Sequence, residues 1–184
     1  MEDNASAILA IVLAAIIMFG YPLITMARKT DKAAQIVVES STDEYVDTIR
    51  TKAIIKQSDY EAFLSKISST GNAFDIEFEL QRLDENASKR ATQGSTSKQT
   101  KNTYATYYTT QVMQMIQDGD GVLLLKEGDI ITVKVKNVNT TIFQQLTKYV
   151  GENSVAGKIV ASSSGIITTS SWLRGFWDNN MKKI

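Results

Sequence analysis

The sequence contains no cysteine and no histidine among its 184 residues. Without cysteine there is no disulfide, no thiol nucleophile and no Cys/His zinc site. Without histidine there is no imidazole for general acid–base catalysis or for a Ser-His-Asp triad. The Walker A, GxGxxG and GxSxG motifs do not occur either. These absences favour a non-enzymatic protein that uses no cofactor and no metal.

A net charge of either sign is also lacking, since 20 basic residues balance 20 acidic ones. Because only Glu2 and Asp3 are charged before Arg28, residues 28–184 are close to neutral. A neutral domain has no field that would steer nucleic acid, and nothing indicates a small-molecule substrate. The single proline, Pro22, precedes this region, so no Pro-rich linker divides it. We therefore expect one soluble domain, residues 28–184, after an N-terminal segment, residues 1–27.

The most prominent feature is a run of 23 uncharged residues, Ala5–Ala27. About 20 apolar residues span a bilayer core as a helix, whereas a signal peptide has a shorter apolar core and a basic flank. The run therefore predicts a retained single-pass transmembrane helix in the cell membrane, with a buried core helix as the alternative. Small residues allow close packing in lipid, and a proline tends to kink a helix. The residues expected to serve anchoring and assembly are Ala5, Ala10, Ala14, Ile16, Phe19 and Pro22.

The charges that flank the run bear on orientation. Arg28, Lys29 and Lys32 follow it, while Glu2 and Asp3 precede it. The positive-inside rule would place the large domain in the cytoplasm.

The remaining pattern predicts an α+β fold in which a small, mostly antiparallel sheet packs with two or three helices. Strands are expected at 74–82, on either side of a turn at 127–129, and at 157–168. Helices are expected at 33–54, 58–72, 104–117 and 140–150. The first of these would extend the transmembrane helix as an amphipathic helix, either as one rod or with a break near 40–42. The third has a β-prone start, and Ser58 with Glu61 forms a capping box for the second. Asn139 or Thr140 would cap the fourth, with Ile142, Phe143, Leu146 and Val150 buried.

Three further features bear on function. Residues 84–103 are polar and predict a mobile loop. Carboxylates at Asp75, Glu77 and Asp129 are the one candidate for acid chemistry, although alternation along 74–82 favours a solvated sheet face. The C-terminal segment has an apolar stripe, which predicts either a flap over the core or a partner-docking site. Its members are Trp172, Leu173, Phe176 and Trp177.

The order of an uncharged helix, an amphipathic extension and a sheet with helices resembles the type IV pilin-like proteins. Residues 46–79, the stretches GDIITVKVKN and NTTIFQQL, and the closing strand are similar to small membrane proteins of Tad-like pilus loci in clostridia. The resemblance implies a structural role on the cell surface, with other subunits or copies of itself as partners and an extracytoplasmic domain. The run contains no glutamate and follows MEDNASA, which favours a minor pilin or a non-polymerising tether. The alternative that the flanking charges leave open is a cytoplasm-facing adaptor of a secretion or conjugation complex.

Overall fold

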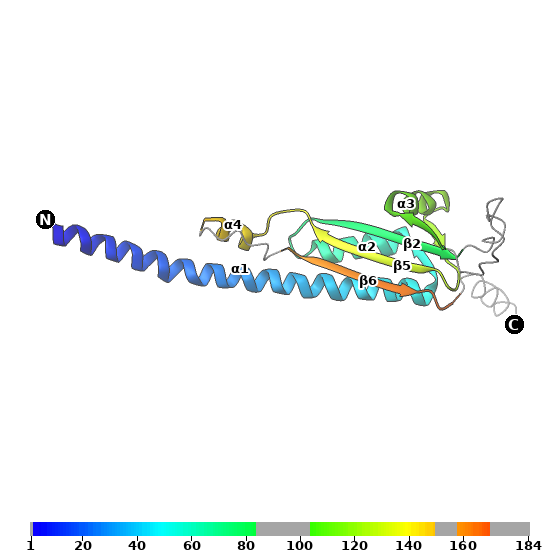
Figure 1. Ribbon diagram of the computed structural model, residues 1–184, viewed down its shortest axis with the longest axis horizontal. Helices are drawn as coiled ribbons and strands as arrows, with labels where there is room; N and C mark the ends of the chain where they lie inside the picture. Colours follow the sequence, from blue (N-terminus) through cyan, green and yellow to red (C-terminus); the bar gives the residue numbers. More distant parts are fainter. Residues whose placement is uncertain (1, 84–103, 150–157, 170–184) are drawn as a thin grey trace, which may run out of the picture.

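The computed structural model describes residues 2–83, 104–149 and 158–169. One long helix, α1 (Glu2–Lys52), carries an α+β domain on its C-terminal half (Figure 1). At 1.5 Å per residue its 51 residues span about 76 Å. The expected continuous rod is confirmed.

The alternative prediction, a break near residues 40–42, is wrong. Ser41 and Thr42 are buried inside the helix, and the Thr42 hydroxyl donates a hydrogen bond of 2.7 Å to the carbonyl of Val38. This bond within the helix satisfies a polar side chain that would otherwise favour a turn. Pro22 does not end the helix either, and the Thr25 hydroxyl donates to the carbonyl of Tyr21 beside it.

The main sheet has four antiparallel strands in the order β3-β2-β5-β6. Their bounds are β2 (Phe74–Leu83), β3 (Tyr104–Tyr108), β5 (Ile130–Asn137) and β6 (Val160–Ile166). A second sheet pairs β1 (Ile54–Lys56) with β4 (Val122–Leu124). The strands expected at 74–82 and 157–168 are confirmed. Residues 122–124 and 130–137 are both strands, but they pair with β1 and with β2 and β6 rather than with each other.

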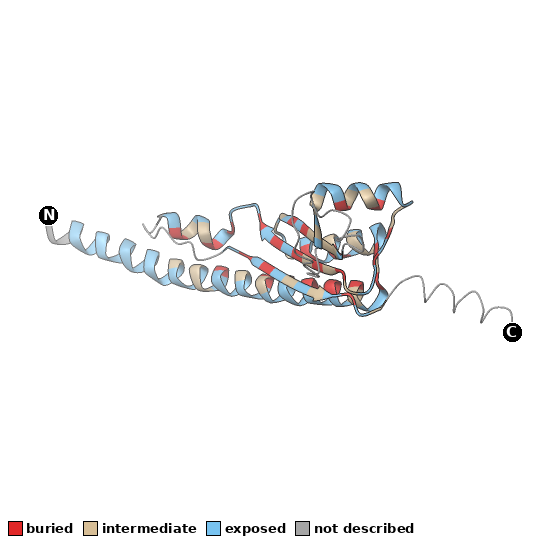
Figure 2. Cartoon of the chain, turned by 45° about the vertical axis from the view of Figure 1, so that its right-hand side comes forward, coloured by how far each residue is buried: buried red, intermediate tan, exposed pale blue. Residues whose placement is uncertain are grey.

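The core lies between one face of the main sheet and three helices: the C-terminal half of α1, α2 (Gln57–Ser68) and α3 (Thr109–Asp118). Every second residue is buried from Ile76 to Leu80 of β2 and from Ile131 to Asn137 of β5, as period-two alternation predicts. The Tyr45 ring of α1 stacks on Phe63 of α2 at 4.6 Å between centroids and meets Phe78 of β2 edge-on at 6.3 Å. Figure 2 shows the consequence, since buried residues occur along α1 only beyond its N-terminal part.

Two helix starts differ from expectation. Residues 104–108 form β3, so the helix expected from residue 104 begins at Thr109. The capping box at Ser58 is wrong, because α2 begins at Gln57 and its cap residue, Lys56, makes no side-chain cap bond. Gly71 follows α2 with φ of 81°, a left-handed conformation that glycine adopts without steric cost.

Candidate membrane anchor and its junction with the folded domain

The first half of α1 is apolar and exposed. Its exposed large side chains are Ile8, Leu9, Ile11, Val12, Leu13, Ile16, Ile17, Met18, Phe19, Tyr21, Leu23 and Met26. Within the described residues, α1 is the one helix long and apolar enough to cross a membrane. The 23 residues of the run span about 35 Å, against a hydrocarbon core of about 30 Å. The length and exposure are compatible with single-pass anchoring, and the run is not buried against the described part of the chain.

The six residues predicted to serve anchoring all lie on this exposed part of α1. Ala7, Ala10 and Ala14 share one face of the helix, since they are three and four residues apart. Ile16 lies nearly opposite Ala14, because two residues turn the helix by about 200°. The structure does not gather these residues into one cluster, and their role in assembly stays a prediction.

A short helix, α4 (Ile142–Tyr149), packs on α1 where the apolar run ends. Thr141 caps it: the Thr141 hydroxyl accepts from the Gln144 amide at 3.3 Å, and the Gln144 side chain accepts from the Thr141 amide at 3.1 Å. This reciprocal pair is a capping box, one residue beyond the predicted cap at Asn139 or Thr140. The same Thr141 hydroxyl donates to the Asp31 carboxylate of α1 at 2.6 Å.

An aromatic contact fixes the other side of this junction. Phe143 is 3% exposed, and the guanidinium carbon of Arg28 lies 5.0 Å from its ring centroid. That distance is typical of a cation–π interaction. The prediction that Ile142 is buried is wrong, since it is 67% exposed. Phe143 takes the place against α1 instead, and Leu146 is half-buried.

Farther along α1, two polar side chains attach it to the edge strand β6. The Gln35 amide accepts from the backbone N–H of Val160 at 3.1 Å and donates to its carbonyl at 2.7 Å. Arg50 donates to the carbonyl of Ile166 at 3.2 Å. Gln35 and Arg50 are fifteen residues apart on the helix, a rise of about 22 Å, and their partners Val160 and Ile166 are six residues apart on the strand, a rise of about 20 Å. The two contacts therefore have nearly the same spacing on α1 and on β6. Because open sheet edges invite pairing with other chains, α1 protects this edge.

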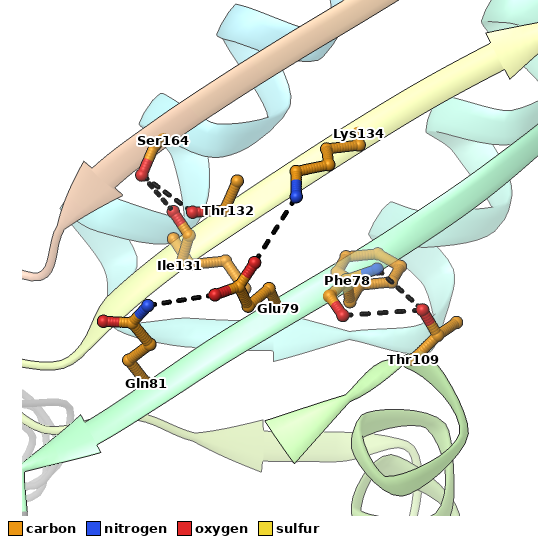
Figure 3. A network of polar contacts seen from close by, with 8 residues as sticks. All are labelled: Phe78, Glu79, Gln81, Thr109, Ile131, Thr132, Lys134 and Ser164. Atoms are coloured by element: carbon orange, nitrogen blue, oxygen red, sulfur yellow. Dashed lines mark hydrogen bonds and ion pairs between the residues drawn. The ribbon is translucent and has the colours of Figure 1, made fainter. Parts of the chain in front are cut away.

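The outer face of the main sheet is polar. Glu79 accepts from the Gln81 amide at 3.0 Å and from the Lys134 ammonium at 3.5 Å (Figure 3). The bond from Gln81, together with Lys134, lowers the pKa of Glu79 below its ordinary value. Thr132 and Ser164 continue the same row with a hydroxyl pair at 2.8 Å. This arrangement is typical of cross-strand pairs on a solvated face.

The three candidate carboxylates do not converge. Asp75 and Glu77 are exposed on β2, and in the strand register they lie opposite Lys136 and Lys134 of β5. Asp129 is 2% exposed at the other end of β5, where it accepts backbone bonds from Lys126 and Leu83. Asp129 therefore holds a turn. Among residues 2–83, 104–149 and 158–169 no group of acids is placed to hold a metal ion.

Three predicted features lie outside the described residues. They are the loop 84–103, the burial of Val150 and the apolar stripe of Trp172, Leu173, Phe176 and Trp177. Conversely, sequence reasoning missed Asp31, Thr141, Gln35 and Arg50. The T-x-x-Q spacing of Thr141 and Gln144 was a readable signal for the cap. Nothing in the sequence indicated the contacts over more than 100 residues.

Comparisons with known protein families, curated proteins and solved structures give no match for this chain.

Proposed function

We propose that this chain is a non-enzymatic structural subunit of a pilus-like or secretion/conjugation surface assembly, anchored in the cell membrane by α1 and similar to a minor pilin. The observation that carries the proposal is the division of α1. Its first half is bare and apolar, and its second half belongs to the domain core, within a single unbroken helix. A rod of this kind holds a domain at a set distance and orientation from the bilayer, as an assembly subunit requires.

The rod is joined to the domain along its length. Val38, Val46 and Ile49 of α1 are at most 1% exposed within the core, and Gln35 and Arg50 hold β6. Bending α1 at the domain would expose these side chains to water, which costs about 25 cal/mol of free energy for each Å² of apolar area exposed. A tethered enzyme gains nothing from such stiffness, whereas a subunit that must align with its neighbours does.

The face with Ala7, Ala10 and Ala14 supports a role in lateral packing. Helices in lipid approach most closely where side chains are small. Neighbouring subunits, or copies of this chain, are the partners that this face fits. On this proposal the domain is extracytoplasmic.

One observation favours a second function. Arg28, Lys29 and Lys32 follow the apolar run, and positive flanks favour the cytoplasmic side. On that reading the chain is a cytoplasm-facing, membrane-tethered adaptor of a secretion or conjugation complex.

Single-cysteine labelling separates the two functions, because the chain has no cysteine of its own. Ser65 is exposed on α2 and tolerates the near-isosteric Ser65→Cys. Intact cells carrying this variant are treated with a membrane-impermeant maleimide, with the cysteine-free chain as control. Labelling before lysis supports the surface subunit, and labelling only after lysis supports the adaptor.

The assembly role needs a second measurement in the same cells. Ala14→Cys and Ile16→Cys are oxidised in parallel, since they differ in face but scarcely in depth. A cross-linked product from Ala14→Cys and not from Ile16→Cys supports lateral packing on the small-residue face. If neither variant cross-links to a second copy, which carries the same cysteine, copies of the chain do not pack through α1 and its role in self-assembly is wrong.

A further inference from the structure

The position of α4 has a consequence for the membrane. Thr141 contacts Asp31 and Phe143 contacts Arg28, so residue numbers increase along α4 where they decrease along α1. The two helices are therefore antiparallel, and α4 runs from the domain toward the apolar half of α1 (Figure 1).

The depth that α4 reaches follows from the helical rise. Arg28 is the first charge after the apolar run, and Phe143 lies beside it. Lys148 is five residues further, about 7 Å deeper, which is level with residue 23 of α1. Exposure along α1 agrees, because Ile24 and Thr25 are half-buried and Ala27 is buried, whereas most residues before them are exposed. The polar layer on each side of a bilayer is about 5 to 7 Å thick, so α4 passes through it.

The surface of α4 that faces away from α1 has the chemistry of this layer. Ile142, Gln145 and Lys148 are exposed there. Lysine can place its stem along apolar chains while its ammonium returns to the phosphates. Arg28, Lys29 and Lys32 are exposed on α1, about 7 to 14 Å farther from the apolar run than Lys148, which puts them at the outer side of the same layer. We call these four cations, Arg28, Lys29, Lys32 and Lys148, the basic collar.

We propose that α4 is a second membrane-contacting element that lies in the headgroup layer, with the basic collar against anionic lipid phosphates. The proposal rests on the anchoring role of α1 given above. It also accounts for the junction, because the capping box and the Asp31 bond hold α4 at one height on the rod. The depth of the whole domain is then set by two elements instead of one.

A second copy of the chain is a poorer occupant for this surface. Copies in one membrane share one orientation, so their basic collars lie at equal height. Like charges at equal height repel, whereas anionic headgroups attract juxtamembrane lysine and arginine.

Depth measurement by spin labelling tests the proposal. The full chain, carrying one nitroxide-labelled cysteine, is reconstituted into vesicles of phosphatidylcholine with phosphatidylglycerol. The sites are Gln145→Cys on α4, Ile16→Cys in the apolar run and Ser65→Cys on α2. Each label's collision with oxygen, which concentrates in lipid, is compared with its collision with a water-soluble nickel chelate. The expected oxygen-to-nickel ratio is highest at Ile16, intermediate at Gln145 and lowest at Ser65.

The outcomes separate this proposal from the anchor itself. A ratio at Gln145 equal to that at Ser65, with Ile16 still high, overturns the headgroup position and leaves the anchor intact. A low ratio at Ile16 overturns the anchor. If the Gln145 signal is broadened by a neighbouring label and sharpens on dilution with unlabelled chain, a second copy covers α4 and the lipid contact is wrong.

Discussion

The contact between α1 and the edge strand β6 allows a quantitative prediction about stability. Gly165 of β6 lies under the side chain of Arg50, and a Cβ at this position would lie 2.0 Å from the Arg50 Cδ. No real contact is so short, so Gly165→Ala must displace Arg50 from its bond to the Ile166 carbonyl. The backbone at Gly165 is not in the left-handed region, so alanine itself adds no strain there.

The expected change in stability follows from two terms. A hydrogen bond from a charged group contributes about 1.5 to 3 kcal/mol, and we take about 1 kcal/mol because Arg50 is partly exposed. Alanine in place of glycine in a strand recovers about 0.5 to 1 kcal/mol. Gly165→Ala alone should therefore change stability by less than about 1 kcal/mol. In an Arg50→Ala background no side chain is displaced, and Gly165→Ala should stabilise by about 0.5 to 1 kcal/mol.

A double-mutant cycle measures the difference. The four full-length chains are unfolded by urea in detergent micelles and followed by far-UV circular dichroism. The expected coupling between positions 50 and 165 is about 1 kcal/mol. Independent sites add within about 0.3 to 0.5 kcal/mol, so a coupling inside that range would refute the packing of Arg50 over Gly165.

Three further predictions concern other parts of the molecule. Ile16→Lys should disfavour membrane insertion by about 2.5 to 3.5 kcal/mol. The control is Ile36→Lys, because Ile36 is about equally exposed on the same helix but lies beyond the apolar run, and this variant should insert normally. An Ile16→Lys chain that is wholly retained by alkali-washed membranes would contradict the anchor. The buried Tyr45 hydroxyl has no hydrogen-bond partner in the described part of the chain, so Tyr45→Phe should leave the free energy of unfolding unchanged or raise it by up to about 1 kcal/mol. Burial raises the pKa of Tyr45 above 10, so the native chain should lose stability relative to Tyr45→Phe as the pH rises beyond 10, and parallel denaturation curves would refute this. Because the pKa of Glu79 is lowered in the folded chain, its carboxylate stabilises the fold fully above pH 4.5, and this stabilisation is lost as the pH falls through the lowered pKa. Glu79→Gln should therefore make the free energy of unfolding fall less steeply as the solution is acidified. An unchanged slope would show that the hydrogen bonds of Glu79 contribute nothing to stability.

Elements with a local signal could be predicted. The alternation from Phe74 to Leu80 is a property of neighbouring residues, and it placed β2 and its buried face correctly. The 23 uncharged residues predicted a helix long enough to cross a bilayer, and α1 is that helix. Val46 and Ile49 are three residues apart and both are buried on α1, in agreement with the amphipathic helix predicted for 33–54.

Elements whose neighbours are distant in sequence were misplaced. Residues 104–108 have helical spacing, but they pair with Glu79–Leu83 and form β3. Val37 lies within the amphipathic extension predicted for 33–54 and is 39% exposed, because the sheet covers only part of the circumference of α1. Local propensity differs between such alternatives by less than about 1 kcal/mol per residue, which tertiary contacts outweigh.

The sequence by itself determined the periodicities, the uncharged run and the absence of cysteine and histidine chemistry, because each depends only on residues close together or on composition. Only the tertiary structure decided that Gln35 and Arg50 hold the edge of β6 and that α4 reaches the end of the apolar run through Asp31 and Arg28. Those contacts join residues more than 100 positions apart, and a hydrogen bond or an aromatic contact forms only after the fold has brought its two partners within a few ångströms.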